Sequence, residues 1–486
     1  MPTVESSPPR RARIVDALVV HGAPIDFREL CLRAIPTGAR TLLLDLDRTV
    51  HLGRNMGELL GWEICAHLGY GPERLAALDR GPGRVALDWS SPAALLRYLS
   101  LSARMWAMPG LHYLVWGKIA WHSPALRRLS FHALGPEPVR AAQRVPQTAL
   151  MHHMAELPLA TLRDLAASVW RRHEPEQVIL REDIAWLRRR CPSLRIVLTS
   201  ASPQPVVEVA AEELGVDDAV YSSIEEEGGW LSAPAQRARV FSPAPAPRRI
   251  SPPAAVRINA SHAKIAEITR RSPDALSAPA DTVGITDTGY GEDHCWAEHL
   301  GHVIDVNSTA PFPPIVGASS PLRSIHSAAL LTRDERARPG RLDPRRGATS
   351  DRGPVVLGEA ELAPALGGTL LHVESLMARF AEAERACADE RAVAERALAA
   401  IEMRAAILVD AYNRGAAGER PGALGRLGVI AAEERRARRD LARAQRPVGA
   451  IAHAVGEALG VARSQVDELI AAPPAARSPS LLSPAT

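Results

Sequence analysis

The sequence is poor in cysteine, and its few cysteines lie far apart. Five occur in 486 residues, namely Cys31, Cys65, Cys191, Cys295 and Cys387, and no two of them form a C-x-x-C pair. This spacing excludes a disulfide framework and a zinc site built from paired cysteines, and it is typical of a protein from a reducing compartment. We therefore expect a cytoplasmic protein.

Long apolar runs and a strong net charge are also missing. No stretch of about 18 or more residues is both uncharged and mostly apolar, so the sequence predicts no membrane-spanning helix. The first residues carry no pattern of a secretory signal. A net charge of +3 is too small for a dedicated nucleic-acid-binding protein, so we expect no nucleic-acid partner. The length of 486 residues allows two or three domains.

Lysine is almost absent. Of the 58 basic residues only Lys118 and Lys264 are lysines, and all the others are arginines. In a chain that uses arginine wherever charge alone is needed, a retained lysine suggests a position that requires a compact ammonium group. Chance retention is the alternative interpretation.

Aromatic residues are scarce and unevenly distributed. All nine tryptophans precede residue 297, and after Phe312 only Phe380 and Tyr412 remain. This distribution predicts a globular part followed by a helical part rich in Ala, Arg and Glu. From composition we expect disordered tails at 1–10 and 471–486, a globular domain at 11–310, a disordered linker rich in Ser, Pro, Arg and Gly at 311–365, and helices at 366–470.

Four short apolar runs end at polar residues, as buried parallel strands do. They are Thr41–Leu44, Arg195–Leu198, Val283–Ile285 and His302–Val306. Helical patterns lie between them, so the sequence predicts an α/β fold with a Rossmann-like, doubly wound parallel sheet. The carboxyl edge of such a sheet is where ligands bind.

A long insertion separates the first two of these runs. Between Leu44 and Arg195 lie many more residues than the dozen or so that a simple crossover needs. We therefore expect an inserted, mostly helical cap at about 60–170. Its aromatic segment 101–122 is interpreted as the apolar core of the cap; contact with a membrane surface is the less favoured alternative.

The last third of the chain has a helical repeat. Apolar residues recur every seven positions from Val373 to Leu408, and a second stripe is interrupted at Glu384 and Arg391. This is coiled-coil spacing, and the glycines near 415–422 predict a break within it. We expect a helical hairpin or coiled coil that could mediate self-association, with an inert helical tail as the alternative.

The first chemical motif, D-x-D-x-T, follows the first apolar run. Asp45 and Asp47 stand two residues apart at the expected end of a strand, followed by Arg48 and Thr49. Two such carboxylates can divide the work of phosphoryl transfer. One binds Mg²⁺ and attacks phosphorus, while the other gives a proton to the leaving group and takes one from water.

Two further elements suit a phosphate group. Ser200, preceded by Thr199, ends the second run where a helix begins, and a hydroxyl there can bind a phosphate oxygen. A plain helix cap, with Ser202 as the capping residue, is the alternative. Lys264 can neutralise a phosphoryl group and a nearby carboxylate as a point charge.

The fourth element is an acidic loop after the third run. Asp287 is followed by Glu292 and Asp293 in a segment that contains glycines. Carboxylate oxygens in such a loop are suitable ligands for Mg²⁺. A solvated turn is the alternative.

In this order the four elements resemble the haloacid dehalogenase (HAD) superfamily of aspartate-nucleophile phosphohydrolases. The resemblance covers about 40–310. The helical insertion and the strings Ser200-Ala201-Ser202-Pro203 and Val303-Ile304-Asp305-Val306-Asn307 are similar to the phosphoserine phosphatase-like branch; the C-terminal helices are an addition. The resemblance implies a phosphatase that needs Mg²⁺ and hydrolyses a small phosphomonoester through an aspartyl-phosphate.

The resemblance also implies roles for the residues of the first two motifs. Asp45 would be the nucleophile, and Asp47 the general acid and base, with its main-chain carbonyl on Mg²⁺. Thr49 would support the loop. Ser200 would bind the phosphoryl oxygen, with Thr199 as the alternative register.

For the remaining motifs it implies that Lys264 stabilises charge on the nucleophile and that Asp287 binds Mg²⁺ with Glu292 or Asp293. Two residues depart from the family pattern, because Arg48 and Thr286 stand where glycine is frequent. Arg48 would place a cation near the entrance, where it would either assist an anionic substrate or simply point outward.

Two other functions fit the same residues. A catalytically weak scaffold would bind a phosphorylated partner and assemble through its C-terminal helices. A phosphotransferase would differ only in the acceptor that attacks the intermediate. The cap contains no motif that identifies a substrate.

Overall fold

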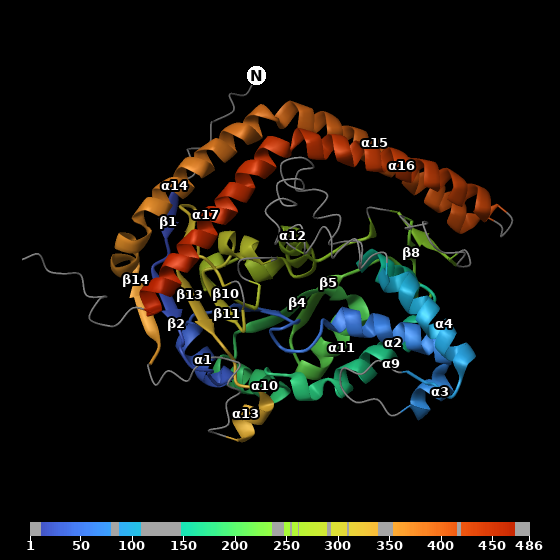
Figure 1. Ribbon diagram of the computed structural model, residues 1–486, viewed down its shortest axis with the longest axis horizontal. Coiled ribbons are helices and arrows are strands. Elements are labelled where there is room, and N and C mark those ends of the chain that lie inside the picture. Colours follow the sequence, from blue (N-terminus) through green and yellow to red (C-terminus); the bar gives the residue numbers. More distant parts are fainter. Residues whose placement is uncertain are drawn as a thin grey trace, which may run out of the picture.

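The structure is a computed structural model, shown in Figure 1. It describes residues 11–78, 87–107, 147–235, 247–252, 255–260, 262–288, 293–308, 311–338, 353–415 and 419–471. The predicted tails, apart from Ala471, and most of the aromatic segment 101–122 lie outside these residues.

An eight-stranded sheet forms the centre of the molecule. Its strand order is β14-β2-β13-β11-β10-β3-β4-β5, and every pair is parallel except β14 with β2 at one edge. The strands are β2 (Ala17–Val20), β3 (Thr41–Asp45), β4 (Arg195–Pro203), β5 (Asp218–Ser222), β10 (Thr282–Thr286), β11 (His302–Val306), β13 (Ser324–Ala328) and β14 (Val355–Gly358). The four predicted runs form β3, β4, β10 and β11, which are neighbours in the sheet and confirm the predicted α/β fold.

Helices cover both faces of this sheet (Figure 1). Because side chains alternate along a strand, Leu42 and Leu44 of β3 pack on one face and Leu43 on the other. The first face is covered by α1 (Phe27–Ala34), α10 (Arg181–Arg190) and α11 (Gln204–Leu214), and the second by α12 (His262–Arg271) and the 3₁₀ helix η9 (His294–Glu298). The doubly wound arrangement is therefore confirmed.

The register of the central strands aligns their carboxyl ends. Asp45 pairs with Thr199 across β3 and β4, and Leu44 pairs with Ile285 across β3 and β10. The residues that follow these pairs are thus brought to one edge of the sheet although they are far apart in the sequence. Asp287, two residues after Ile285, lies at this edge.

The insertion between β3 and β4 is helical where it is described, as expected. It contains α2 (Met56–Tyr70), α3 (Pro72–Ala77), α4 (Pro92–Ser102), the π-helix η1 (Ala103–Ala107) and α9 (Leu159–Arg172). Aromatic rings pack inside it: Trp62 stacks on Trp106, with ring centroids 5.7 Å apart, and Tyr70 stacks on Tyr98 at 5.1 Å. Of the aromatic segment 101–122, the described residues 101–107 contribute to this packing through buried Met105.

The prediction of a disordered linker at 311–365 is wrong for the residues that the structure describes there. They form β12 (Ile315–Gly317), which pairs with β1 (Ala12–Ile14), then β13 in the sheet, α13 (Arg333–Ala337), the edge strand β14 and the start of the first C-terminal helix. Composition misled the prediction, because these strands are only three to five residues long and lie among Ser, Pro and Arg residues. Tertiary pairing stabilises apolar runs that are too short to stand out in a sequence.

The C-terminal helices form one long antiparallel hairpin that arches over the sheet (Figure 1). Two helices run outward, α14 (Glu359–Ala386) and α15 (Ala388–Arg414), and two return, α16 (Arg420–Ala444) and α17 (Arg446–Ala471). α14 packs on α17 and α15 on α16. Val373, Cys387, Ala394 and Ile401 of the seven-residue repeat are buried.

Both ends of the hairpin are attached to the globular part. Near its base, Leu362 and Val466 share a buried core with Leu18 of the sheet. At its tip, the Tyr412 hydroxyl donates to the Pro247 carbonyl at 2.5 Å, and Asn413 exchanges two hydrogen bonds with the main chain of Ile250. The hairpin is therefore part of the folded body and not a tail behind a linker. None of the described helices has the length and hydropathy needed to cross a membrane.

Candidate active site

The carboxyl edge of the sheet gathers most of the predicted site residues. Asp45 ends β3, Ser200 lies in β4, and Asp287 follows β10, while Lys264 comes from the first turn of α12. All four side chains are buried. We call Asp45, Asp47, Asp287 and Asp293, together with Lys264, the carboxylate edge.

Lys264 bridges two carboxylates of the edge. The residue is 2% exposed, and its Nζ donates to Asp45 Oδ1 at 3.0 Å and to Asp293 Oδ1 at 2.8 Å. The same ammonium lies 4.9 Å from the centre of the Trp296 ring, a cation–π distance. A compact ammonium fits between these three groups, in agreement with the interpretation of this lysine as one that arginine could not replace.

Asp47 turns toward the end of β4. Its Oδ2 accepts hydrogen bonds from the hydroxyls of Ser202, at 2.8 Å, and Ser200, at 3.2 Å. Its Oδ1 accepts from the Met56 amide at 2.7 Å, at the start of α2. These contacts hold the carboxylate beside Ser200 and connect the first motif to the second.

Ser202 does not cap the helix that follows β4, which was the alternative role for it. Its hydroxyl is not the cap of α11, for which the structure has no capping side chain, and instead donates to Asp47. Sequence reasoning missed this contact; the only available signal was a second hydroxyl two residues after Ser200.

Thr199 and Ser200 face opposite partners. The Thr199 hydroxyl accepts from the Asn259 side-chain amide at 3.2 Å, whereas Ser200 donates to Asp47. Asn259 is fully buried and also donates to the Ser200 carbonyl at 2.7 Å and to the Val220 carbonyl at 3.1 Å. Asn259 thus holds the end of β4 against β5. The sequence analysis did not single it out, although it stands only five residues before Lys264.

Asp293 belongs to the site, whereas Glu292 lies outside the described residues. Asp293 is fully buried, and its Oδ2 accepts from the hydroxyls of Thr286, at 2.6 Å, and Thr288, at 3.3 Å, while Oδ1 accepts from Lys264. The threonine that departs from the family pattern therefore orients the carboxylate that holds the lysine. The carboxylate of Asp287 accepts no hydrogen bond from the part of the chain that is described.

Arg48 and Thr49 complete the loop after β3. Thr49 is buried and lies 3.4 Å from Asp45 Oδ2, to which its hydroxyl donates. Arg48 adopts a left-handed conformation with φ 63° and is exposed. Its charge acts to lower the pKa of Asp287 and so partly opposes the effect of burial on that carboxyl.

The buried negative charge of the edge exceeds the positive charge. Burial raises the pKa of Asp45 well above its usual value, although Lys264 opposes this shift. Burial, followed by the charge of Asp293, raises the pKa of Asp287 to about 7. Both shifts have the same first cause, burial, and the neighbouring carboxylates add to it because several of them face a single buried ammonium.

This charge surplus and the oxygen-only donor set fit a hard dication such as Mg²⁺. Among the described residues the side chains of Asp45, Asp47 and Asp287 do not converge as a trio at metal-ligand spacing, because Asp47 is turned toward the serines. Asp45 and Asp287 would supply carboxylate oxygens, and the main-chain carbonyl of Asp47 would supply the third.

Comparisons with known proteins give structural neighbours only. No protein-family model and no curated protein matches the chain. A protein of unknown function from Bordetella pertussis Tohama I is 12% identical with a TM-score of 0.32, and covers 56% of this chain and 92% of its own. A HAD family hydrolase from Salmonella enterica serovar Typhi is 12% identical with a TM-score of 0.31, and the coverages are 58% and 70%. A substrate-bound phosphoserine phosphatase is 13% identical with a TM-score of 0.26, and the coverages are 56% and 87%.

The chain is thus similar in structure to HAD family hydrolases and phosphoserine phosphatases. At these identities and TM-scores the similarity carries no conclusion about activity, which must be argued from the site.

Proposed function

We propose that this protein is a phosphatase that depends on Mg²⁺ and hydrolyses a small phosphomonoester through an aspartyl-phosphate on Asp45. The observation that carries the proposal is the contact of the buried Lys264 ammonium with Asp45, 3.0 Å away at the carboxyl edge of the sheet. A buried lysine beside a buried carboxylate at a ligand-binding edge stabilises the ionised form that a nucleophile requires.

In the first step an oxygen of Asp45 attacks phosphorus, and the bond between phosphorus and the leaving oxygen breaks. Asp47, held by Ser200 and Ser202, gives its proton to that leaving oxygen, so the alcohol departs neutral. With substrate bound, the Ser200 hydroxyl would donate to a phosphoryl oxygen in place of Asp47. In the second step water attacks phosphorus and Asp47 takes the water's proton. The bond between phosphorus and the Asp45 oxygen breaks, which releases phosphate and restores the free carboxylate of Asp45.

Mg²⁺, held by Asp45, Asp287 and the Asp47 carbonyl, would neutralise negative charge on the phosphoryl oxygens and so let a carboxylate approach them. Lys264 contributes the same kind of compensation through its contact with Asp45 Oδ1. Asp293 and Thr286 keep the ammonium in place. Arg48 is exposed in the loop that carries Asp47, and its cation would attract an anionic substrate.

The test is turnover of an aryl phosphate and of a broad panel of phosphorylated metabolites, with and without Mg²⁺. We expect Asp45→Asn to lower turnover by at least about 10³-fold with the fold intact, because the amide cannot form the intermediate. Arg163→Gln, which removes an exposed ion pair with Glu212 away from the edge, is the matched control and keeps full turnover. Equal turnover by wild type and Asp45→Asn would refute the proposal.

The scaffold alternative makes the opposite prediction for the same panel. A protein that only binds a phosphorylated partner shows no metal-dependent turnover with any member. Deleting the hairpin does not separate the two functions, because Leu362 and Val466 are part of the core.

A further inference from the structure

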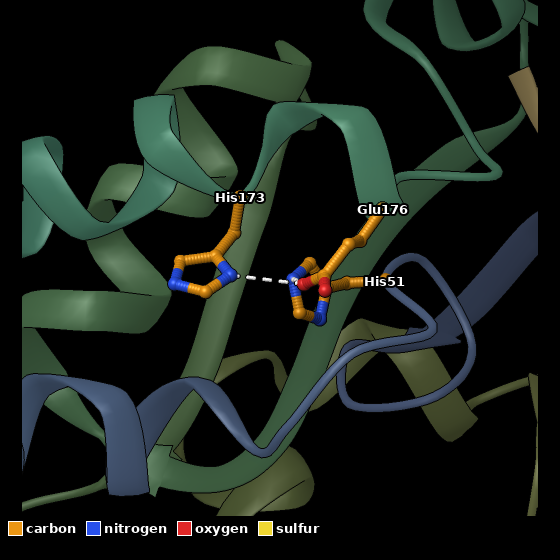
Figure 2. Close-up of side chains that lie close together, drawn as sticks. All are labelled: His51, His173 and Glu176. Atoms are coloured by element: carbon orange, nitrogen blue, oxygen red, sulfur yellow. Dashed lines mark hydrogen bonds and ion pairs between the residues drawn. The ribbon is translucent and has the colours of Figure 1, made fainter. Parts of the chain in front are cut away.

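A second group of buried polar side chains lies at the base of the cap. His51 follows the D-x-D-x-T loop, His173 follows α9, and Glu176 ends the 3₁₀ turn η4 (Glu174–Glu176). One nitrogen or carboxylate oxygen of each lies within 4.8 Å of the other two. Figure 2 shows His173 and Glu176, which come from the segment at η4, pointing toward His51, which comes from the loop after β3. We call these three residues the hinge cluster.

A single carboxylate oxygen lies close to both imidazoles. Glu176 Oε2 is 2.9 Å from His173 Nδ1 and 3.2 Å from His51 Nε2. The two rings are 5.8 Å apart between centroids and inclined at 66°. Donors bound to one zinc ion at about 2.1 Å lie about 3.4 Å from one another in a tetrahedral site, so the present spacing is near that of a ligand set.

His51 is the most deeply buried member of the cluster. The residue is fully buried, and neither nitrogen has a hydrogen-bond partner among the described residues, since the approach of Nε2 to Glu176 lacks hydrogen-bond geometry. Buried polar atoms without a partner are rare and point to a missing ligand or ion. Burial also lowers the pKa of His51, and the neutral imidazole is the form that ligates metals.

The cluster bridges the two segments that connect the cap to the sheet. The Leu52 amide donates to the Glu176 carbonyl at 3.0 Å, and the Val178 amide donates to the Val50 carbonyl at 2.9 Å. Gly53 leaves the space for the cluster, because a Cβ atom there would lie 2.1 Å from Glu176 Oε2. The same segment leads back to Asp47 of the catalytic loop.

We propose that His51, His173 and Glu176 bind one divalent transition-metal ion, zinc in the first instance, which ties the cap's return segment to the catalytic loop. Two imidazoles and one carboxylate suit zinc far better than Mg²⁺, which prefers oxygen ligands only. Glu176 is about one-third exposed, so a water molecule can take the fourth position. This site is separate from the carboxylate edge and does not depend on the proposed phosphatase activity.

The experiment measures metal retention by the full chain. Metal-stripped protein is given zinc or Co²⁺ in an excess of Mg²⁺, dialysed, and analysed for bound metal and for the visible absorption of Co²⁺ in a low-coordinate site. We expect about one equivalent per chain in wild type and also in Asp287→Asn, which alters only the carboxylate edge. His173→Gln and Glu176→Gln should weaken retention at least tenfold.

The matched control is His153→Gln. His153 and Glu156 form the same kind of pair three residues apart, at 3.1 Å, but no third ligand completes a cluster among the described residues. This variant should retain as much metal as wild type.

Two outcomes overturn the proposal: wild type retains no zinc or Co²⁺, or Glu176→Gln retains as much as wild type. Either result would leave Glu176 with only its hydrogen bond to His173. Hydrogen exchange of wild type gives a second readout that needs no variant. Zinc should slow exchange in residues 50–53 and 174–178, and unchanged exchange there counts equally against the site.

Discussion

The carboxylate edge and the hinge cluster are both polar and largely buried, but they contain different chemical groups. The edge collects oxygen atoms from the ends of several strands and places them around one ammonium. The hinge cluster joins two imidazoles to one partly exposed carboxylate, from two segments that hydrogen-bond to each other. The edge carries surplus charge, whereas the hinge carries little.

This difference determines how each cluster affects the stability of the protein when no metal is bound. Buried carboxylates that repel one another lower the stability of the folded state as they ionise. Neutral imidazoles beside a carboxylate that is open to water have no such effect. Changes at the edge should therefore alter stability and pH dependence strongly, and changes at the hinge should alter metal binding with little effect on stability.

The largest effect should come from Lys264→Met. Removing the ammonium leaves Asp45 and Asp293 buried without a counter-charge, so we expect a loss of about 3–5 kcal/mol in the free energy of unfolding and no measurable turnover. Urea denaturation measures the loss. Arg333→Met, which breaks an exposed ion pair with Glu174, should cost less than about 1 kcal/mol. Equal losses in the two variants would show that the buried ammonium stabilises the fold no more than an exposed ion pair does.

The metal-free protein should become less stable as the pH rises from about 4 to about 7. The pKa of Asp287 is about 7 in the folded state and lower when unfolded, so in this range the folded state binds more protons. The loss is up to about 4 kcal/mol at about 1.4 kcal/mol per pKa unit.

Thermal unfolding in EDTA measures this slope. Mg²⁺ should stabilise the protein increasingly as the pH rises, because only the ionised carboxylate binds it. Asp287→Asn should flatten both effects. A stability that rises over this interval without metal would contradict the assigned charge surplus.

Asn259→Ala should have an intermediate effect. Its amide donates to Thr199, Ser200 and Val220, and these buried acceptors would lose their partner. We expect a loss of about 1–3 kcal/mol and, because Ser200 is less well positioned, a lower kcat at nearly unchanged KM. Asn413→Ala, at the hairpin tip, removes hydrogen bonds of a similar kind without a catalytic neighbour and should leave kcat unchanged. A kcat loss of equal size there would remove Asn259 from the site.

The smallest effect should come from Glu176→Gln without metal. The amide keeps a hydrogen-bond acceptor near both imidazoles, and the side chain is partly solvated, so we expect a change below about 1 kcal/mol. Asp293→Asn at the edge should cost clearly more, because it removes a fully buried partner of Lys264. Guanidinium denaturation of both metal-free variants measures the two losses in the free energy of unfolding. A larger loss in Glu176→Gln than in Asp293→Asn would contradict the prediction.

Much of the fold could be predicted because the parallel strands are short, continuous apolar runs. β3, β4, β10 and β11 stand out for this reason, and the seven-residue repeat identified the hairpin. The edge strands could not be found in the same way. β12 and β14 are stabilised by partners near the N-terminus, β1 and β2, and their own composition resembles that of a loop.

The candidate site was predicted where a reactive side chain coincides with a strand end, as at Asp45, or where a rare residue type marks a position, as at Lys264. It was missed where a residue acts only through its neighbours. Asn259 and Ser202 are ordinary polar residues until β4 and β5 place acceptors around the first and Asp47 beside the second. His51 and His173 are separated by the whole cap, so no local pattern joins them.

The order of the chemical groups along the chain, the scarcity of lysine and the apolar runs were determined by the sequence alone, since each is a property of neighbouring residues. The contact of Ser200, and not Thr199, with Asp47, the pairing of Lys264 with Asp293 and the hinge cluster were decided only by tertiary structure. They depend on strand register and on burial, and these arise when distant segments pack and exclude water.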